Sequence, residues 1–124
     1  MADLKKFKEI NDTMGHEIGD QILIQTASVF KENISNQDSI IRLGGDEFII
    51  VLVNYSEQEV SDKVELLYHE VRKICIDNQE QKYVDVDLGC SYTESFIASK
   101  VCMDAMLKQA DKAMYSMKKG KSRE

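Results

Sequence analysis

The chain has 124 residues, of which 43% are hydrophobic and 31% are charged, and its formal net charge is −6. This length and composition are typical of one globular domain. The negative charge argues against a nucleic-acid polymer as partner, because neutralising its phosphates requires a basic face. No apolar run approaches the length of a membrane span, so we expect no membrane contact from this segment.

The first half of the chain predicts one helix followed by two strands. Apolar residues from Ile18 to Ile34 follow helical spacing. Ile40–Leu43 and Phe48–Val53 are short apolar runs typical of strands, and the second reads as a buried strand. Because only four residues separate the two runs, we expect a β-hairpin.

The second half predicts a helix, a strand and a final helix. Ser56, with Glu59 three residues later, is a typical helix N-cap, and the apolar stripe that follows extends to about Ile76. Tyr83–Leu88 reads as a strand with Asp85 and Asp87 pointing outward. The last helix spans Met103–Lys118, and its methionine stripe is interpreted as core. This order predicts an α+β fold with helices against a mostly antiparallel sheet.

Three cysteines, Cys75, Cys90 and Cys102, form no C-x-x-C pair and are odd in number. We interpret them as buried or half-buried thiols in a reducing compartment, which predicts a cytoplasmic location.

The predicted hairpin tip, Gly44-Gly45-Asp46-Glu47, is the most informative short segment. Two glycines let a ligand approach the backbone closely. A carboxylate at such a tip is a hard oxygen donor suited to Mg²⁺ or Mn²⁺. Adjacent residues on a strand point to opposite faces, so we expect Asp46 and Glu47 to have separate roles. Taken alone, such a segment is more often a solvated acidic turn.

The segment Asp3–Asp20 combines polar side chains with two spaced glycines. Asn11 and Asp20 can both pair with a purine edge, because a carboxylate accepts hydrogen bonds and an amide both donates and accepts. The alternative interpretation is that Asn11 belongs to a turn and that Asp20 is an acid in the first turn of a helix.

Together these segments resemble the GGDEF family of diguanylate cyclases. The similarity comprises D-L-x-x-F-K-x-I-N-D-x-x-G-H-x-x-G-D at Asp3–Asp20, R-L-G-G-D-E-F at Arg42–Phe48 and A-D-x-A-M-Y at Ala110–Tyr115. The resemblance implies a ferredoxin-like sandwich of the nucleotide-cyclase type, with residues 1–124 as one domain. It also implies that two such domains pair as a homodimer, each holding one GTP, and produce cyclic di-GMP and pyrophosphate.

The resemblance also assigns roles to individual residues. It makes Asp3, the Leu4 carbonyl and Asp46 ligands of Mg²⁺ or Mn²⁺. It makes Asp46 the candidate base for the attacking hydroxyl, and it places Glu47 at the second metal or its shell.

Further residues would bind the nucleotide. Asn11 and Asp20 would read guanine, His16 would line the pocket, Lys8 would contact phosphate, and Gly44 and Gly45 would give the nucleotide access to the backbone. For His16 a half-buried structural role stays open. Lys118 and Lys121 match a basic pair that grips the terminal phosphates, with a spacing one residue short; lysines also favour helix C-termini through the helix dipole.

Three features depart from the family pattern. Lys5 stands where a second acidic residue is usual, and its ammonium would either weaken metal binding or reach a phosphate. Ser35 replaces the arginine of an inhibitory R-x-x-D site that ends at Asp38. Only Met1 and Ala2 precede Asp3, so we expect an N-terminally truncated domain that lacks the family's first strand and is inactive by itself.

Two alternatives to a cyclase stay open. The chain could be a degenerate GGDEF domain that binds GTP and regulates a partner, which Lys5 favours and the intact Asp46 and Glu47 oppose. It could also be a pure dimerisation module.

Overall fold

The structure, a computed structural model, describes residues 1–76, 79–94 and 99–119. Its main sheet has four strands in the order β2-β3-β1-β6, all paired antiparallel. These strands are β1 (Ala2–Leu4), β2 (Ser39–Gly44), β3 (Glu47–Val51) and β6 (Val86–Leu88). A second, two-stranded sheet consists of β4 (Cys75–Ile76) and β5 (Gln79–Tyr83).

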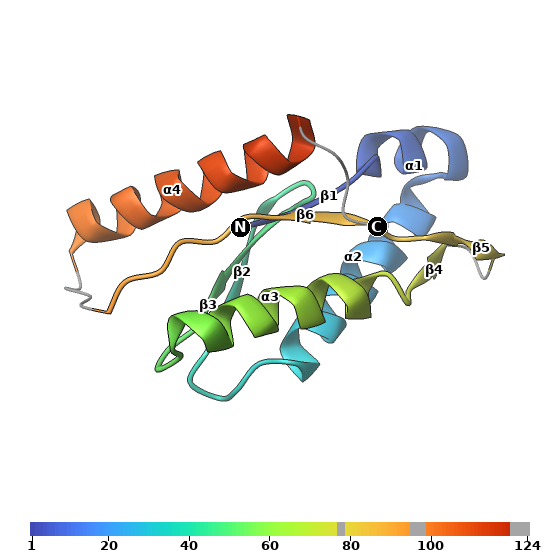
Figure 1. Ribbon diagram of the computed structural model, residues 1–124. Coiled ribbons are helices and arrows are strands. Elements are labelled where there is room, and N and C mark those ends of the chain that lie inside the picture. Colours follow the sequence, from blue (N-terminus) through green and yellow to red (C-terminus); the bar gives the residue numbers. More distant parts are fainter. Residues whose placement is uncertain (77–78, 95–98, 120–124) are drawn as a thin grey trace.

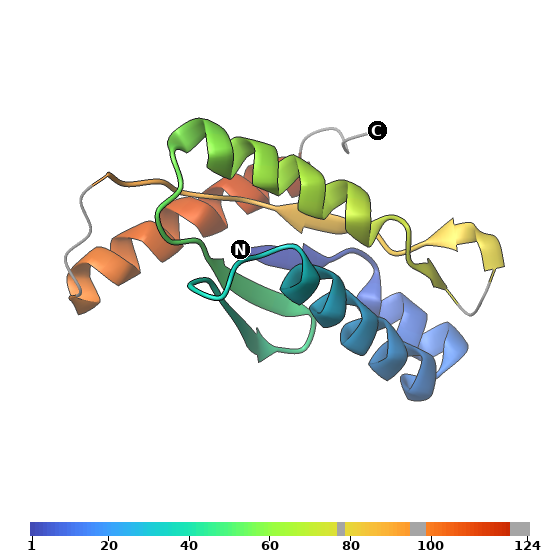
Figure 2. The same ribbon diagram turned by 90° about the horizontal axis from the view of Figure 1, so that it is seen from below.

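Four helices surround the main sheet. They are α1 (Phe7–Met14), α2 (His16–Glu32), α3 (Glu57–Val71) and α4 (Lys100–Lys119). Figure 1 shows α4 on one side of the sheet and α2 and α3 on the other, and Figure 2 shows α2 and α3 in front of the strands. This arrangement confirms the α+β sandwich. None of the described helices is long and apolar enough to cross a membrane.

The core lies between the sheet and helices α2 and α3. Phe30 of α2 meets Phe48 of β3 edge to face, with ring centroids 5.5 Å apart. Ala2, Phe48 and Leu88 occupy directly opposite positions on β1, β3 and β6, and all three are buried. In an antiparallel pair such residues share a face. The intervening residues Asp3, Glu47 and Asp87 therefore share the opposite face, on the side of α4.

A short strand stands where we expected the family's first strand to be missing. Ala2–Leu4 forms β1 at the centre of the sheet, where Ala2 and Asp3 pair with Phe48 and Glu47. The pattern missed it because three residues are too few for a periodicity signal. The paired part is short, however, and beyond Phe48 the β3 residues Ile49–Val51 border a cavity described below. For that reason β3 is mostly half-buried rather than fully buried as expected.

Several element boundaries also differ from the expectations. α3 begins as predicted, with Ser56 and Glu59 forming a reciprocal capping box, but it ends at Val71. The apolar residues that follow, Ile74 and Ile76, are buried in and beside β4 instead. Tyr83 and Leu88 belong to two different strands, β5 and β6.

Three burial expectations need correction. Asp87, expected to point outward, is 2% exposed because α4 covers that face of the sheet. Cys90 is exposed, whereas Cys75 and Cys102 are half-buried as expected. The methionine stripe is core only in part, since Met114 is buried and Met103 is exposed.

Candidate metal and nucleotide site

The hairpin tip is a glycine-dependent turn held by its neighbours. Gly44 has φ 124° and Gly45 has φ 55°, conformations that side-chain-bearing residues rarely adopt. Arg42 donates two hydrogen bonds to the Gly45 carbonyl, from Nε at 3.1 Å and from a terminal guanidinium nitrogen at 2.8 Å. The Leu4 amide donates to the Asp46 carbonyl at 3.0 Å. These bonds fix the turn against β1.

Three carboxylates converge beside this turn. Asp3, Asp46 and Glu47 each offer an oxygen, and these oxygens lie within 4.8 Å of one another. Asp3 is buried, and Asp46 and Glu47 are half-buried. Asp46 and Glu47 were expected to diverge, but Asp46 lies in the turn rather than on the strand, so strand alternation does not separate them.

The carboxylates of this cluster repel one another. Burial, a hydrogen bond with Asp3 and the negative charge of Asp3 raise the pKa of Asp46 above its usual 3.8. Clustered carboxylate oxygens are the donor set that Mg²⁺ and Mn²⁺ prefer. The residues present therefore fit such an ion. The part assigned to the Leu4 carbonyl stays a prediction; its amide holds the turn.

Lys5 does not enter the carboxylate cluster. Its ammonium lies 3.4 Å from Asp87 and 3.7 Å from Asp85, and its backbone N–H donates to the Asp85 carbonyl at 2.9 Å. Asp85 also pairs with Arg72 at 3.6 Å. The pairing of Lys5 across the β1–β6 edge could not be read from the sequence, since it depends on the register of strands more than 80 residues apart.

The proposed guanine readers lie on the α1–α2 pair. Asn11 is on α1, and His16 and Asp20 are on α2. The buried Asn11 Oδ1 has no hydrogen-bond partner among the residues that the structure describes. A Cβ added at Gly19 would overlap this oxygen, so glycine at 19 makes room for the Asn11 amide. Gly19 thus borders a predicted guanine reader. The sequence analysis did not single it out, although it is one of the two glycines of the Asp3–Asp20 motif.

The remaining predicted site residues are less constrained. Lys8, His16 and Asp20 are exposed, which excludes the half-buried structural role considered for His16. Lys118 lies on α4 near its end, and Lys121 lies outside the described residues. Asp38 accepts hydrogen bonds from Ser35, Val53 and Tyr55, and therefore braces the loops at the far end of the hairpin.

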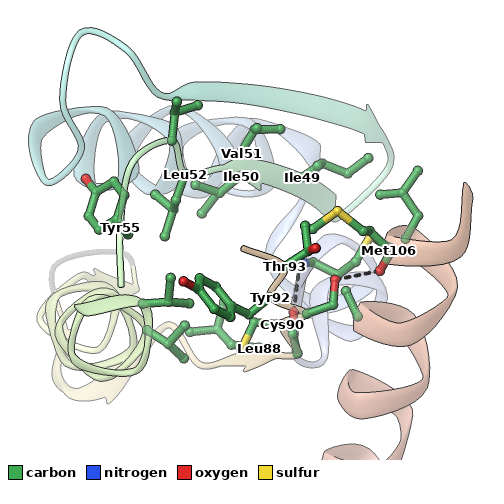
Figure 3. A pocket seen from close by; sticks show the side chains of 18 of the residues that line it. Ile49, Ile50, Val51, Leu52, Tyr55, Leu88, Cys90, Tyr92, Thr93 and Met106 are labelled. Atoms are coloured by element: carbon green, nitrogen blue, oxygen red, sulfur yellow. Dashed lines mark hydrogen bonds between the residues drawn. The ribbon is translucent and has the colours of Figure 1, made fainter. Parts of the chain in front are cut away.

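An apolar cavity of about 300 Å³ lies between β3, the segment after β6, α3 and α4. Figure 3 shows Ile50 and Leu52 on one side of it and Tyr92 and Met106 on the other. None of the three clustered carboxylates lines it. We interpret it as an opening in the sheet and not as the nucleotide site.

These features describe a small α+β domain with a carboxylate cluster at a double-glycine turn. A family model described as "Diguanylate cyclase, GGDEF domain" matches residues 1–124. The chain belongs to the GGDEF family.

Relatives and solved structures agree with this membership. The chain is 36% identical over 119 residues to "Diguanylate cyclase DosC" of Escherichia coli, covering 96% of this chain and 25% of that protein. It is 34% identical over 120 residues to "Diguanylate cyclase A" of Treponema denticola, covering 95% of this chain and 31% of that protein. The chain thus spans less than a third of these curated relatives.

Among solved structures, the GGDEF domain of DgcB from Caulobacter crescentus, in complex with c-di-GMP, superposes with a TM-score of 0.82 at 26% identity. The match covers 96% of this chain and 70% of that one. The active GGEEF domain of a diguanylate cyclase from Vibrio cholerae gives a TM-score of 0.78 at 26% identity, with 95% and 73% covered.

Proposed function

We propose that this chain is the diguanylate cyclase domain of a longer protein and condenses two GTP molecules into cyclic di-GMP. The observation that carries the proposal is the convergence of Asp3, Asp46 and Glu47 at the Gly44-Gly45 turn in a chain of this family. The Lys5 ion pairs with Asp85 and Asp87 weaken the argument for a degenerate domain, because the ammonium does not occupy the cluster.

In the proposed reaction the 3′-hydroxyl oxygen of each GTP forms a bond to the α-phosphorus of the other. The bond from that phosphorus to the bridging oxygen breaks, and two pyrophosphates leave. Because the described residues contain one carboxylate cluster, two copies of the chain are needed to act on two GTP molecules. Catalysis of this kind depends mainly on positioning and on neutralising charge.

The residues of the candidate site divide into metal ligands, a base, guanine readers and phosphate contacts. Asp3, Asp46 and Glu47 would hold Mg²⁺ or Mn²⁺, which when bound neutralises the triphosphate and polarises its oxygens. An Asp46 carboxylate oxygen accepts the 3′-hydroxyl proton. Asn11 and Asp20 orient guanine, with His16 beside them. Lys8, Lys118 and Lys121 contact phosphates, and a cytoplasmic location supplies the GTP.

The test is an assay of the full-length protein with GTP and Mg²⁺, in which cyclic di-GMP is the expected product. Asp46→Asn should reduce turnover by at least about 10²-fold, as expected for loss of a charged group at the reacting centre. Asp62→Asn, on the exposed face of α3, is the matched control and should keep normal turnover. GTP binding without any product in the unmutated protein would instead support the regulatory alternative.

A further inference from the structure

A row of three carboxylates crosses the main sheet. Asp3 of β1 stands directly opposite Glu47 of β3 on one side and Asp87 of β6 on the other. Residues directly opposite in antiparallel strands have Cβ atoms about 4.5–5.5 Å apart on the same face, and like charges there repel. Asp87 is 2% exposed, so water screens this repulsion poorly.

Lys5 supplies the counter-charge at one end of the row. Its Nζ lies 3.4 Å from the Asp87 Oδ1, and its side chain is 23% exposed. A buried carboxylate is costly unless it is paired, and the pairing with Lys5 meets that requirement for Asp87. At the other end of the row, Asp3 and Glu47 gather with Asp46. Asp87 is therefore neutralised by the Lys5 ammonium, whereas Asp3 and Glu47 belong to the candidate metal site.

We propose that Lys5 is a positioning residue that holds the Asp87 carboxylate out of the metal site and thereby sets the site's affinity for a divalent cation. The inference rests on the proposed function only in taking Asp3, Asp46 and Glu47 as the metal ligands. When the ammonium is removed, the negative charge of Asp87 is no longer balanced by Lys5. Asp87 then adds that charge, or an oxygen ligand, to the metal site. Removing the Asp87 charge leaves the ammonium paired with Asp85 alone, at 3.7 Å, so more of its positive charge acts on the row.

The two substitutions therefore have opposite effects on metal binding. We expect Lys5→Met to tighten Mn²⁺ binding and Asp87→Asn to weaken it, each by roughly three- to tenfold, the scale of one charge acting through a partly solvated medium. The double variant Lys5→Met/Asp87→Asn should return to within about twofold of the unmutated protein, because the pair is removed together. Lys5→Arg keeps the charge and should bind Mn²⁺ normally.

The experiment is a Mn²⁺ titration of the purified protein followed by the electron paramagnetic resonance signal of free Mn²⁺, a readout independent of turnover. Arg72→Met is the matched control, since it removes an ion pair to Asp85 but none to Asp87. Melting temperatures without metal show which variants fold. If Lys5→Met does not fold, Asp87→Asn and the double variant still test the proposal.

The outcomes separate this inference from the proposed function. Opposite shifts in Mn²⁺ affinity that cancel in the double variant support it. Unchanged affinity in both single variants, with only a lower melting temperature, overturns it and leaves Lys5 as a structural partner. No Mn²⁺ binding by the unmutated protein would overturn the proposed metal site itself.

Discussion

Gly19 of α2 lies directly against Asn11 of α1, so closely that a Cβ at position 19 would overlap the Asn11 Oδ1. We expect Gly19→Ala to displace the Asn11 amide and to weaken GTP binding by about tenfold, the cost of leaving one buried polar group unpaired. Alanine favours a helix by about 1 kcal/mol over glycine, which offsets part of the steric cost to folding. Calorimetric titration with GTP, alongside thermal unfolding, separates the two effects.

The control for this prediction is the same substitution in an Asn11→Ala background. With no amide to displace, Gly19→Ala should then cause little further loss of GTP affinity. An equal loss in both backgrounds would show that position 19 acts through helix packing and not through Asn11.

A second prediction concerns the carboxylate cluster and pH. Burial and Asp3 raise the pKa of Asp46 in the folded state. At a pH between the usual 3.8 and this raised pKa, the folded chain therefore holds a proton that the unfolded chain has released. Its metal-free stability should therefore fall as pH rises from below about 3.8 through the raised pKa. Mg²⁺ should reverse this loss at pH 7, and a ligand at 100 times its dissociation constant adds about 2.7 kcal/mol.

Asp46→Asn tests the sign of both effects. The variant should be more stable than the unmutated protein without metal at pH 7, and it should gain little from Mg²⁺. Melting curves between pH 4 and 8, with Mg²⁺ or with a chelator, measure this. A variant that still gains the full Mg²⁺ increment would place the ion elsewhere.

A third prediction concerns Asp38. Partial burial acts to raise the pKa of Asp38, but hydrogen bonds from Tyr55, Val53 and Ser35 outweigh it and hold the pKa below its usual 3.8. The stability from this carboxylate is thus present above about pH 4 and is lost as pH falls through the lowered pKa. Asp38→Asn should lower the melting temperature at pH 7 and flatten its acid limb. Tyr55→Phe, which removes one donor, should cost about 1 kcal/mol or less.

The same hydrogen bonds bear on feedback inhibition. Asp38 is occupied by its own loops, and Ser35 offers no guanidinium fork for a product phosphate. We therefore expect weak or no binding of cyclic di-GMP here. Micromolar binding that disappears in Asp38→Asn would contradict this expectation.

The hairpin could be predicted because its signals are local. Two apolar runs and a double glycine sit within about 15 residues, and the capping box at Ser56 and Glu59 is a signal within four residues. The convergence of Asp46 and Glu47 was missed because strand alternation was applied to a residue in the turn. Helix α1 was read as a polar motif and not as a helix, since it is only eight residues long.

The long-range pairings could not be predicted in this way. The burial of Asp87 and its pairing with Lys5 follow from the β1–β6 register, which joins residues at opposite ends of the chain. β1 itself is defined by its two neighbours and not by its own three residues. Sequence patterns thus locate the carboxylates along the chain. The strand register of the sheet determines that Asp87 pairs with Lys5 and that Asp3 lies beside Asp46 and Glu47.

The last prediction concerns the apolar cavity beside Met1. The β1–β6 ladder continues through Met1, whose amine and carbonyl both bond to Gly89 at 2.9 and 3.0 Å. Burial lowers the pKa of that amine. In the register of Ala2 with Phe48, residues placed ahead of Met1 would run between Ile50 and Cys90, through the cavity. A chain without them should associate through this opening and turn over little GTP, because β1 holds Asp3 through few pairs.

We therefore expect an N-terminal extension of four apolar, β-branched residues to stabilise the domain by at least about 2 kcal/mol, since each buried aliphatic side chain contributes about 1.5–3 kcal/mol before the cost of ordering it. Denaturant unfolding measures this gain, and sedimentation should show less association. A Gly-Ser extension of equal length is the control, because it adds backbone without apolar side chains. Equal stability for the two extensions, or ordinary cyclase turnover by the monomeric 124-residue chain, would show that the cavity does not need a strand.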